Sequence, residues 1–132
     1  MLDIDHFKKV NDTFGHPFGD RVIKGLAQLL RKRLRKSDII GRYGGEEFVV
    51  AMPNTQQAQA LKILDELRVS FSQLYFEPAL SEFTCTFSCG VATTPPIESA
   101  TTLVNLADDA LYRAKSSGRN RIEAIINGVR HD

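Results

Sequence analysis

Apolar residues recur along this chain with two different periods, and the alternation of those periods constrains the fold more than any other feature. Over residues 82–92 nearly every second residue is apolar, which predicts a strand with one buried face. Spacings of three and four residues instead predict amphipathic helices over 19–35, 58–74 and 103–118. Because strand and helix segments alternate, we expect an α/β (α+β) domain whose central, mostly antiparallel sheet is flanked by helices.

A pair of glycines joins two further predicted strands. The runs 37–43 and 46–52 are rich in Ile, Val, Tyr and Phe, and only Gly44 and Gly45 lie between them. This pattern predicts a hairpin closed by a two-residue turn with positive φ. The glycines have two interpretations, a turn that needs glycine for its geometry or a close approach of the backbone to a nucleotide. A last strand is predicted over 121–126.

The two ends of the chain complete the predicted domain. Residues 1–4 have the pattern of a strand end, and Asp5 is positioned to cap a short helix over 6–14. We expect one domain over 1–126, followed by a loose polar tail over 127–132.

The composition excludes several classes of function. Lys and Arg number 17 against 16 Asp and Glu, so the net charge of +1 gives no field that gathers nucleic acid or anionic membranes. No apolar run is long enough to span a bilayer and no secretory signal is present, so we expect no membrane insertion and a cytoplasmic location. Cys85 and Cys89 share one strand face but lie too far apart to bridge, which favours buried thiols in a reducing compartment.

Three carboxylates occupy predicted strand ends. Asp3 lies where the first strand ends, and Glu46 and Glu47 follow the glycine pair. Hard oxygen ligands of this kind suit magnesium better than any Cys or His set in the chain. The alternative is that carboxylates of a hairpin are simply solvated, and spacing alone favours that interpretation.

Two cations near the end of the last predicted helix have a similar pair of interpretations. Lys115 and Arg119 are four residues apart and are able to hold a polyphosphate together. Cations at this end of a helix are equally favoured by the helix dipole alone.

Two further polar residues and one ion pair are ambiguous when taken singly. Asn11 and Asp20 offer an amide and a carboxylate, which suit the donor edge of guanine, although Asp20 also suits a helix cap. Arg35 and Asp38 are spaced for a local ion pair of little consequence.

Taken together, these residues fall into a recognisable series of motifs. In order and spacing the motifs resemble the GGDEF family of diguanylate cyclases, with Gly44-Gly45-Glu46-Glu47 as the GGEEF form of its signature, from Met1 to about Ile125. The motifs are Leu2-Asp3-Ile4-Asp5-His6-Phe7-Lys8, Asn11-Asp12, Gly15-His16, Gly19-Asp20, Arg35-Lys36-Ser37-Asp38, Arg42-Tyr43-Gly44-Gly45-Glu46-Glu47-Phe48, Ala114-Lys115 and Gly118-Arg119-Asn120.

The resemblance implies a fold like that of nucleotidyl cyclase and polymerase palm domains, with GTP lying across Gly44 and Gly45. It implies Mg²⁺, with Mn²⁺ as an alternative, bound by Asp3, the Ile4 carbonyl and Glu46. Glu47 is then a further ligand or the activator of the attacking hydroxyl. The nucleotide contacts implied are Asn11 and Asp20 to guanine, the Phe7 and Lys8 amides to the phosphates, and Lys115 and Arg119 to the β and γ phosphates.

The reaction implied by the resemblance is the condensation of two GTP into cyclic di-GMP and two pyrophosphates. Each domain holds one GTP, so the active species is a homodimer. Arg35 and Asp38 match the family's RxxD product-inhibition site, to which Arg68 is a candidate addition.

Comparison with the family pattern also identifies segments that this sequence lacks. The N-terminal helix, its Asp-x-Leu-Thr-Gly-Leu-type turn and most of the first strand are expected before Met1, which makes catalysis by this exact chain an open question. An upstream sensory domain is expected in the parent protein, whose membrane anchoring is left open. The alternative to an enzyme is a catalytically silent module that binds GTP or cyclic di-GMP and signals through a partner.

Overall fold

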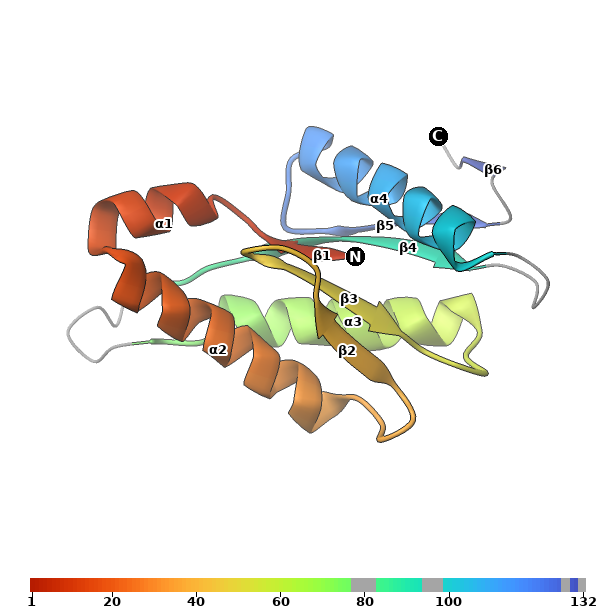
Figure 1. Ribbon diagram of the computed structural model, residues 1–132, viewed down its shortest axis with the longest axis horizontal. Coiled ribbons are helices and arrows are strands. Elements are labelled where there is room, and N and C mark those ends of the chain that lie inside the picture. The colour runs from red at the N-terminus through yellow and green to blue at the C-terminus, as the bar shows by residue number, and fades with distance from the viewer. Residues whose placement is uncertain (77–82, 94–98, 127–128, 131–132) are drawn as a thin grey trace.

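The computed structural model describes residues 1–76, 83–93, 99–126 and 129–130, which form a central sheet with helices on both faces (Figure 1). Within these residues six strands pair in the order β2-β3-β1-β4-β5-β6, and all neighbours are antiparallel except β4 and β5. The predicted fold class is confirmed. The elements are β1 (Leu2–Ile4), α1 (Phe7–Phe14), α2 (His16–Arg33), β2 (Ile39–Arg42), β3 (Glu47–Ala51), α3 (Gln57–Ser72), β4 (Phe87–Thr93), α4 (Ala100–Ser116), β5 (Ile122–Ile126) and β6 (Val129–Arg130).

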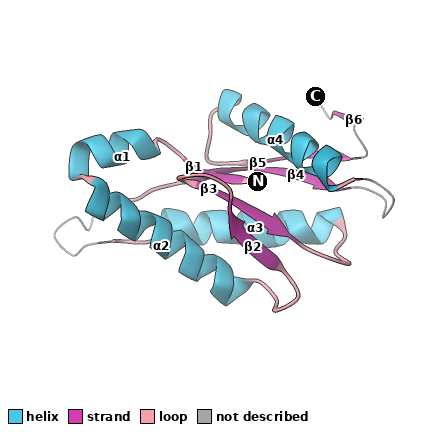
Figure 2. Cartoon of the chain, in the orientation of Figure 1, coloured by secondary structure: helices cyan, strands magenta, loops and turns pink. Residues whose placement is uncertain are grey.

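Successive residues of the central strand β1 belong to opposite faces of the sheet. Leu2 and Ile4 join the larger core, which α1, α2 and α3 cover, whereas Met1 packs with Ala107 and Leu111 of α4. Figures 1 and 2 show α4 on one side of the sheet and α2 and α3 on the other. Because side chains alternate along a strand, Asp3 lies on the α4 face.

The alternation predicted over residues 82–92 is confirmed in the core. Cys85, Phe87 and Cys89 are buried together, and Phe83 packs against them. The strand itself starts later than expected, at Phe87, which is the register partner of Ile4, the last residue of β1. Beyond this pair the Asp5 amide still donates to the Thr86 carbonyl at 2.9 Å. Both thiols are free and buried, as expected.

The predicted helices are present with shifted ends. Helix α2 begins at His16 rather than Gly19, because Gly15 ends α1 with φ 89° and Pro17 suits the first turn of a new helix. At the other end of the chain, the residues expected to form a loose tail include β6, which pairs with β5. Residues 127–128 and 131–132 of that tail lie outside the described part. Among the helices that are described, none is long and apolar enough to cross a membrane.

Helix α4 lies directly against β4 at Gly90. A Cβ atom on Gly90 would be 2.2 Å from the Ala107 carbonyl oxygen and 2.2 Å from the Leu111 amide nitrogen. Only glycine therefore lets the helix backbone approach the strand this closely. The contact fixes the height of α4 above the sheet, and with it the position of Lys115 in the last turn of the helix.

Candidate active site

Two carboxylates lie opposite each other where β1 meets β3. Asp3 and Glu47 are register partners in this antiparallel pair. Directly opposed residues have Cβ atoms about 4.5–5.5 Å apart and project from the same face. Glu46 joins them from the hairpin, since its carbonyl accepts a hydrogen bond from the Ile4 amide at 3.3 Å. The fold therefore brings together the four predicted metal-binding positions.

Lys115 of α4 offsets part of this negative charge. Its ammonium donates a hydrogen bond to Asp3 Oδ2 and forms an ion pair with it. Burial raises the pKa of Asp3, the hydrogen bond and charge of Lys115 oppose that shift, and the charges of Glu46 and Asp5 add to it. Burial also raises the pKa of Glu47, with the Asp3 charge as the next cause.

The donor atoms at this site suit a hard cation whose remaining ligands come from water or from a substrate. Among the described residues, no three or more Asp, Glu, His and Cys side chains are arranged to hold a metal by themselves. Asp3 Oδ1, however, is buried without a hydrogen-bond partner. Magnesium usually takes one or two carboxylates and completes its shell with water and substrate phosphates. Asp3 with Glu47 opposite it fits that pattern.

Asp5 has a different role from the one predicted. Helix α1 has His6 as its N-cap and no side-chain capping hydrogen bond. The buried Asp5 carboxylate instead accepts from Ser88 Oγ at 2.6 Å, Thr86 Oγ1 at 2.7 Å and the Asn120 amide at 3.0 Å. The capping prediction is wrong because these donors, which are distant in sequence, surround the carboxylate on the α4 face of the sheet.

The Asp5 contact holds the loop that follows α4. Arg119 and Asn120 both have positive φ, 64° and 45°. Asn120 is also held through its side chain, whose Oδ1 accepts from Arg68 Nη1 at 2.9 Å. Of the predicted phosphate-binding pair, Lys115 contacts Asp3, and Arg119 is exposed in the left-handed turn just after the helix.

The glycine hairpin differs from the predicted two-residue turn. The Tyr43 amide donates to the Glu47 carbonyl at 2.9 Å, so the turn consists of residues 44–46. Neither Gly44 nor Gly45 has positive φ, because the longer turn removes the need for it. A Cβ on Gly45 would meet nothing within 4 Å, and one on Gly44 would meet only Glu47 Cβ, at 4.0 Å. The glycines thus leave open space beside the carboxylates.

Helix α1 presents free backbone amides just after β1. The Val10 amide donates to the His6 carbonyl at 3.1 Å, so the amides of Phe7 and Lys8 precede the first amide that donates within the helix. Amides in this position, with the helix dipole behind them, attract anions. The predicted phosphate contacts of Phe7 and Lys8 are therefore available at this end of the sheet.

The two predicted guanine-reading residues are brought close by the packing of α1 on α2. Asn11 lies against Gly19, where a Cβ would be 1.9 Å from Asn11 Oδ1. Asn11 Oδ1 is buried without a hydrogen-bond partner. Asp20 follows Gly19 and is exposed. The alternative role of Asp20 as a helix cap is wrong, because α2 already starts at His16.

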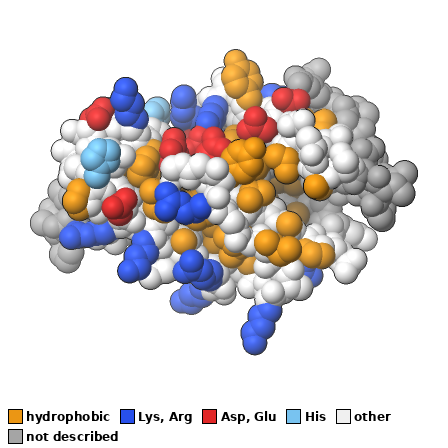
Figure 3. Space-filling model, in the orientation of Figure 1, with side chains coloured by type: hydrophobic (Ala, Val, Ile, Leu, Met, Phe, Trp, Pro, Cys, Tyr) orange, Lys and Arg blue, Asp and Glu red, His pale blue; other side chains and the backbone are white. Residues whose placement is uncertain are grey.

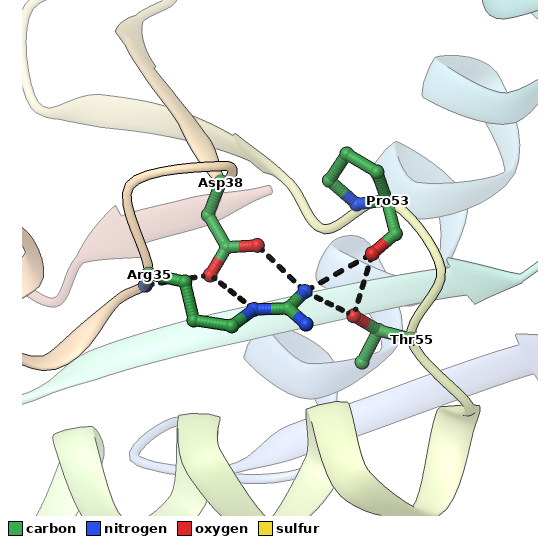
Figure 4. Close-up of polar contacts among 4 residues, drawn as sticks. All are labelled: Arg35, Asp38, Pro53 and Thr55. Atoms are coloured by element: carbon green, nitrogen blue, oxygen red, sulfur yellow. Dashed lines mark hydrogen bonds and ion pairs between the residues drawn. The ribbon is translucent and has the colours of Figure 1, made fainter.

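Arg35 and Asp38 lie at the opposite end of the β2–β3 hairpin from the glycine turn (Figure 4). Arg35 Nη2 donates to Asp38 Oδ1 at 2.9 Å, and Nε donates to Asp38 Oδ2 at 3.3 Å. The same Nη2 also contacts the Pro53 carbonyl at 3.0 Å and Thr55 Oγ1 at 2.5 Å. The hydrogen bond from Arg35 lowers the pKa of Asp38, and the one to Asp38 raises the pKa of Arg35. The pair is thus part of a larger polar cluster.

Sequence reasoning missed the residues that support these side chains. Thr86 and Ser88 alternate with Cys85, Phe87 and Cys89 of the larger core, which signals only that they lie on the opposite face of the sheet. Thr55 stands in a segment that reads simply as the end of a strand. Nothing local in the sequence links any of them to Asp5 or Arg35.

Charged side chains gather on one face of the molecule. Figure 3 shows acidic side chains between α1 and α4, with basic side chains next to them. Beneath the surface, Lys115 of α4 forms an ion pair with the buried Asp3 of β1. An anionic ligand that carries a bound cation would find basic side chains for its negative charge and acidic side chains for the cation on this face.

Comparisons with known proteins agree with this arrangement. Residues 1–121 match the family described as "Diguanylate cyclase, GGDEF domain". The chain is 45% identical over 123 residues to the diguanylate cyclase DgcP of Pseudomonas aeruginosa, covering 93% of this chain and 18% of that protein. It therefore spans less than a fifth of the length of this curated relative.

Solved structures agree as well. The GGDEF domain of DgcB from Caulobacter crescentus, in complex with c-di-GMP, has a TM-score of 0.87 at 39% identity, covering 93% of this chain and 74% of that chain. The active GGEEF domain of a diguanylate cyclase from Vibrio cholerae has a TM-score of 0.86 at 33% identity, covering 93% and 78%.

Proposed function

The chain belongs to the GGDEF family of diguanylate cyclases, and from this premise we propose that it condenses two GTP molecules into cyclic di-GMP with release of two pyrophosphates. The observation that carries the proposal is the opposed pair Asp3 and Glu47, with Lys115 on the same face. Carboxylates, a cation and free helix amides at one sheet end are what a nucleoside triphosphate with its magnesium ion requires.

In this proposal Asp3, the Ile4 carbonyl and Glu46 hold magnesium, or manganese in its place. The unpartnered Asp3 Oδ1 supports it as a ligand, and Lys115 offsets the charge of Asp3 when no cation is bound. A bound divalent ion lowers the pKa of the attacking 3'-hydroxyl and neutralises charge on the α-phosphate. Glu47, whose pKa is raised, is positioned as a further ligand or as acceptor of that hydroxyl proton.

Four sets of residues hold the nucleotide itself. Asn11 and Asp20 accept hydrogen bonds from the N1-H and N2 amino groups of guanine, which the unpartnered Asn11 Oδ1 supports. The Phe7 and Lys8 amides bind the phosphates at the start of α1.

The remaining contacts act on the β and γ phosphates and along the glycine turn. Lys115 and Arg119 bind the β and γ phosphates. The nucleotide lies over Gly44 and Gly45, where the open space permits a close approach. Together these contacts fix the α-phosphate for in-line attack, and positioning of this kind supplies a large part of the rate.

One such site binds one GTP, so catalysis requires two copies that face each other as a homodimer. Residues 1–126 are the catalytic domain, and an upstream sensory domain in the parent protein controls the encounter of the two copies. Turnover therefore rises with more than the first power of protein concentration.

Arg35 and Asp38 form a product-inhibition site. The exposed guanidinium is able to make a bidentate contact with the O6 and N7 atoms of guanine, the edge that arginine also reads in DNA. Arg68, which contacts Asp65 and Asn120, is a candidate for a secondary part of this site.

The test is incubation of the chain with GTP and magnesium, with cyclic di-GMP and pyrophosphate followed by chromatography. The expected result is both products from the native sequence and none from Glu46→Ala. Nucleotide binding without product in either would support a silent binding module instead. Full activity of Glu46→Ala would remove its assigned role as a metal ligand.

A further inference from the structure

We infer that Thr55 and the Pro53 carbonyl compete with cyclic di-GMP for the guanidinium of Arg35, so that Thr55 sets the affinity of the product site. The inference rests on the product-inhibition site proposed above and adds a residue to its regulation. It is carried by the contacts drawn in Figure 4, which join the segment just before β2 to the segment after β3.

The two hydrogen atoms on Arg35 Nη2 are fewer than the acceptors that surround this nitrogen. An arginine side chain has five N–H groups, of which Nη2 carries two. Three acceptors surround Nη2, namely Asp38 Oδ1 at 2.9 Å, the Pro53 carbonyl at 3.0 Å and Thr55 Oγ1 at 2.5 Å. Since Nε also bonds to Asp38, the carboxylate uses the edge formed by Nε and Nη2. The second Nη2 hydrogen is then shared by Pro53 and Thr55.

A guanine base needs that shared hydrogen. A bidentate contact to O6 and N7 takes two N–H groups from one edge of the guanidinium. The Asp38 side chain is only 2% exposed and the Arg35 side chain 45%, so the edge that holds Asp38 is turned inward. The edge left for a ligand is formed by Nη1 and Nη2. To bind guanine through this edge, Nη2 must break its hydrogen bonds to Thr55 Oγ1 and the Pro53 carbonyl.

Thr55 is not required to keep Arg35 in place. Asp38 Oδ2 also accepts from the Arg35 backbone amide at 2.9 Å, so the carboxylate holds both the side chain and the main chain of the arginine. The Thr55 hydroxyl donates to the Pro53 carbonyl at 3.0 Å, which keeps that second competitor in position. Loss of the hydroxyl therefore weakens the competition and leaves the guanidinium anchored.

The experiment measures binding of cyclic di-GMP to the chain by isothermal titration calorimetry for the native sequence, Thr55→Val, Thr55→Ser and Arg35→Ala. Thr55→Val is expected to lower Kd by about three- to tenfold, the value of one hydrogen bond. Thr55→Ser keeps the hydroxyl and is expected to restore the native Kd. Arg35→Ala defines the binding that does not use the guanidinium.

The outcomes separate this inference from the proposed site. If Arg35→Ala weakens binding and Thr55→Val does not tighten it, the competition is wrong and the product site stands. If the native chain and Arg35→Ala bind equally, the product site itself is wrong. Thr55→Ala serves in place of Thr55→Val if the valine variant does not fold, with the same expected tightening.

Discussion

Asp3 and Glu47 are register partners on β1 and β3, so two carboxylates with raised pKa values project from the same face of the sheet. Like charges in directly opposed positions destabilise a sheet. Lys115 contacts Asp3 and offsets part of this repulsion in the free protein. In the proposed complex a cation takes over that role, and the ammonium becomes available to the phosphates.

Replacing Lys115 by methionine tests this exchange. Lys115→Met keeps much of the side-chain length and removes the charge, so we expect the free energy of unfolding to fall by about 1–2 kcal/mol. Magnesium is expected to recover part of that loss, and to stabilise the variant more than the native chain. Urea denaturation with and without magnesium chloride measures both effects. The loss of unfolding free energy caused by Lys115→Met is expected to be smaller in a chain that also carries Glu47→Gln. Equal losses with Glu47 and with Gln at this position would contradict the role of Lys115 in offsetting the carboxylate repulsion.

The guanine contacts predict a change in base selectivity. Asp20→Ala is expected to raise the KM for GTP by about 10- to 100-fold, the range for a hydrogen bond to a charged group, with little effect on ATP binding. Gly19→Ala is expected to act in the same direction, because its Cβ would displace Asn11. Nucleotide titrations with GTP and ATP measure the ratio. Equal losses for both nucleotides would indicate a structural role.

Two glycines predict opposite consequences for the same substitution. Gly45→Ala places a methyl group in open space, so stability is expected to stay within about 0.5 kcal/mol while GTP binding weakens. Gly90→Ala drives a Cβ into the α4 backbone and is expected to cost about 1–3 kcal/mol or more. Thermal unfolding and GTP titration of both variants distinguish the two. A strongly destabilised Gly45→Ala would show that the turn needs glycine.

The buried cysteines predict slow thiol chemistry. Burial raises the pKa of Cys85 to about 12, with the charge of Asp5 as a second cause. Burial also raises the pKa of Cys89. Because only the thiolate is nucleophilic, the native chain is expected to resist iodoacetamide at pH 8 and to react once unfolded. Mass spectrometry over time measures the rate, and rapid labelling of the folded chain would contradict this environment.

Much of the fold was accessible from local pattern. The spacing of Leu64, Leu67 and Phe71 predicts α3, and the alternation through Phe87 and Cys89 predicts the buried face of β4. Such patterns report which side of an element is buried. They carry no information about strand order, which places β1 between β3 and β4.

The sequence likewise predicts one part of the candidate site and not the other. Residues in one motif, such as Glu46 and Glu47, are neighbours in the sequence and remain so in space. The capping prediction for Asp5 is wrong because a carboxylate after a strand has the local signature of an N-cap. Its hydrogen-bond partners in the structure are Thr86, Ser88 and Asn120, which are all distant in the sequence. Buried polar groups must find partners, and the sequence alone does not reveal which distant donors are near.

The central position of β1 has a consequence for how the candidate site assembles. Asp5 reaches Ser88 across 83 positions of sequence, and Lys115 reaches Asp3 across 112. Contacts between distant segments carry the largest loop-closure cost and tend to form late. The candidate site therefore assembles only when residues 86–120 pack against β1, which lies up to 112 positions away in the sequence. Under the proposed function, GTP binding then reports completed folding of this domain, and a partly unfolded chain is expected not to bind GTP.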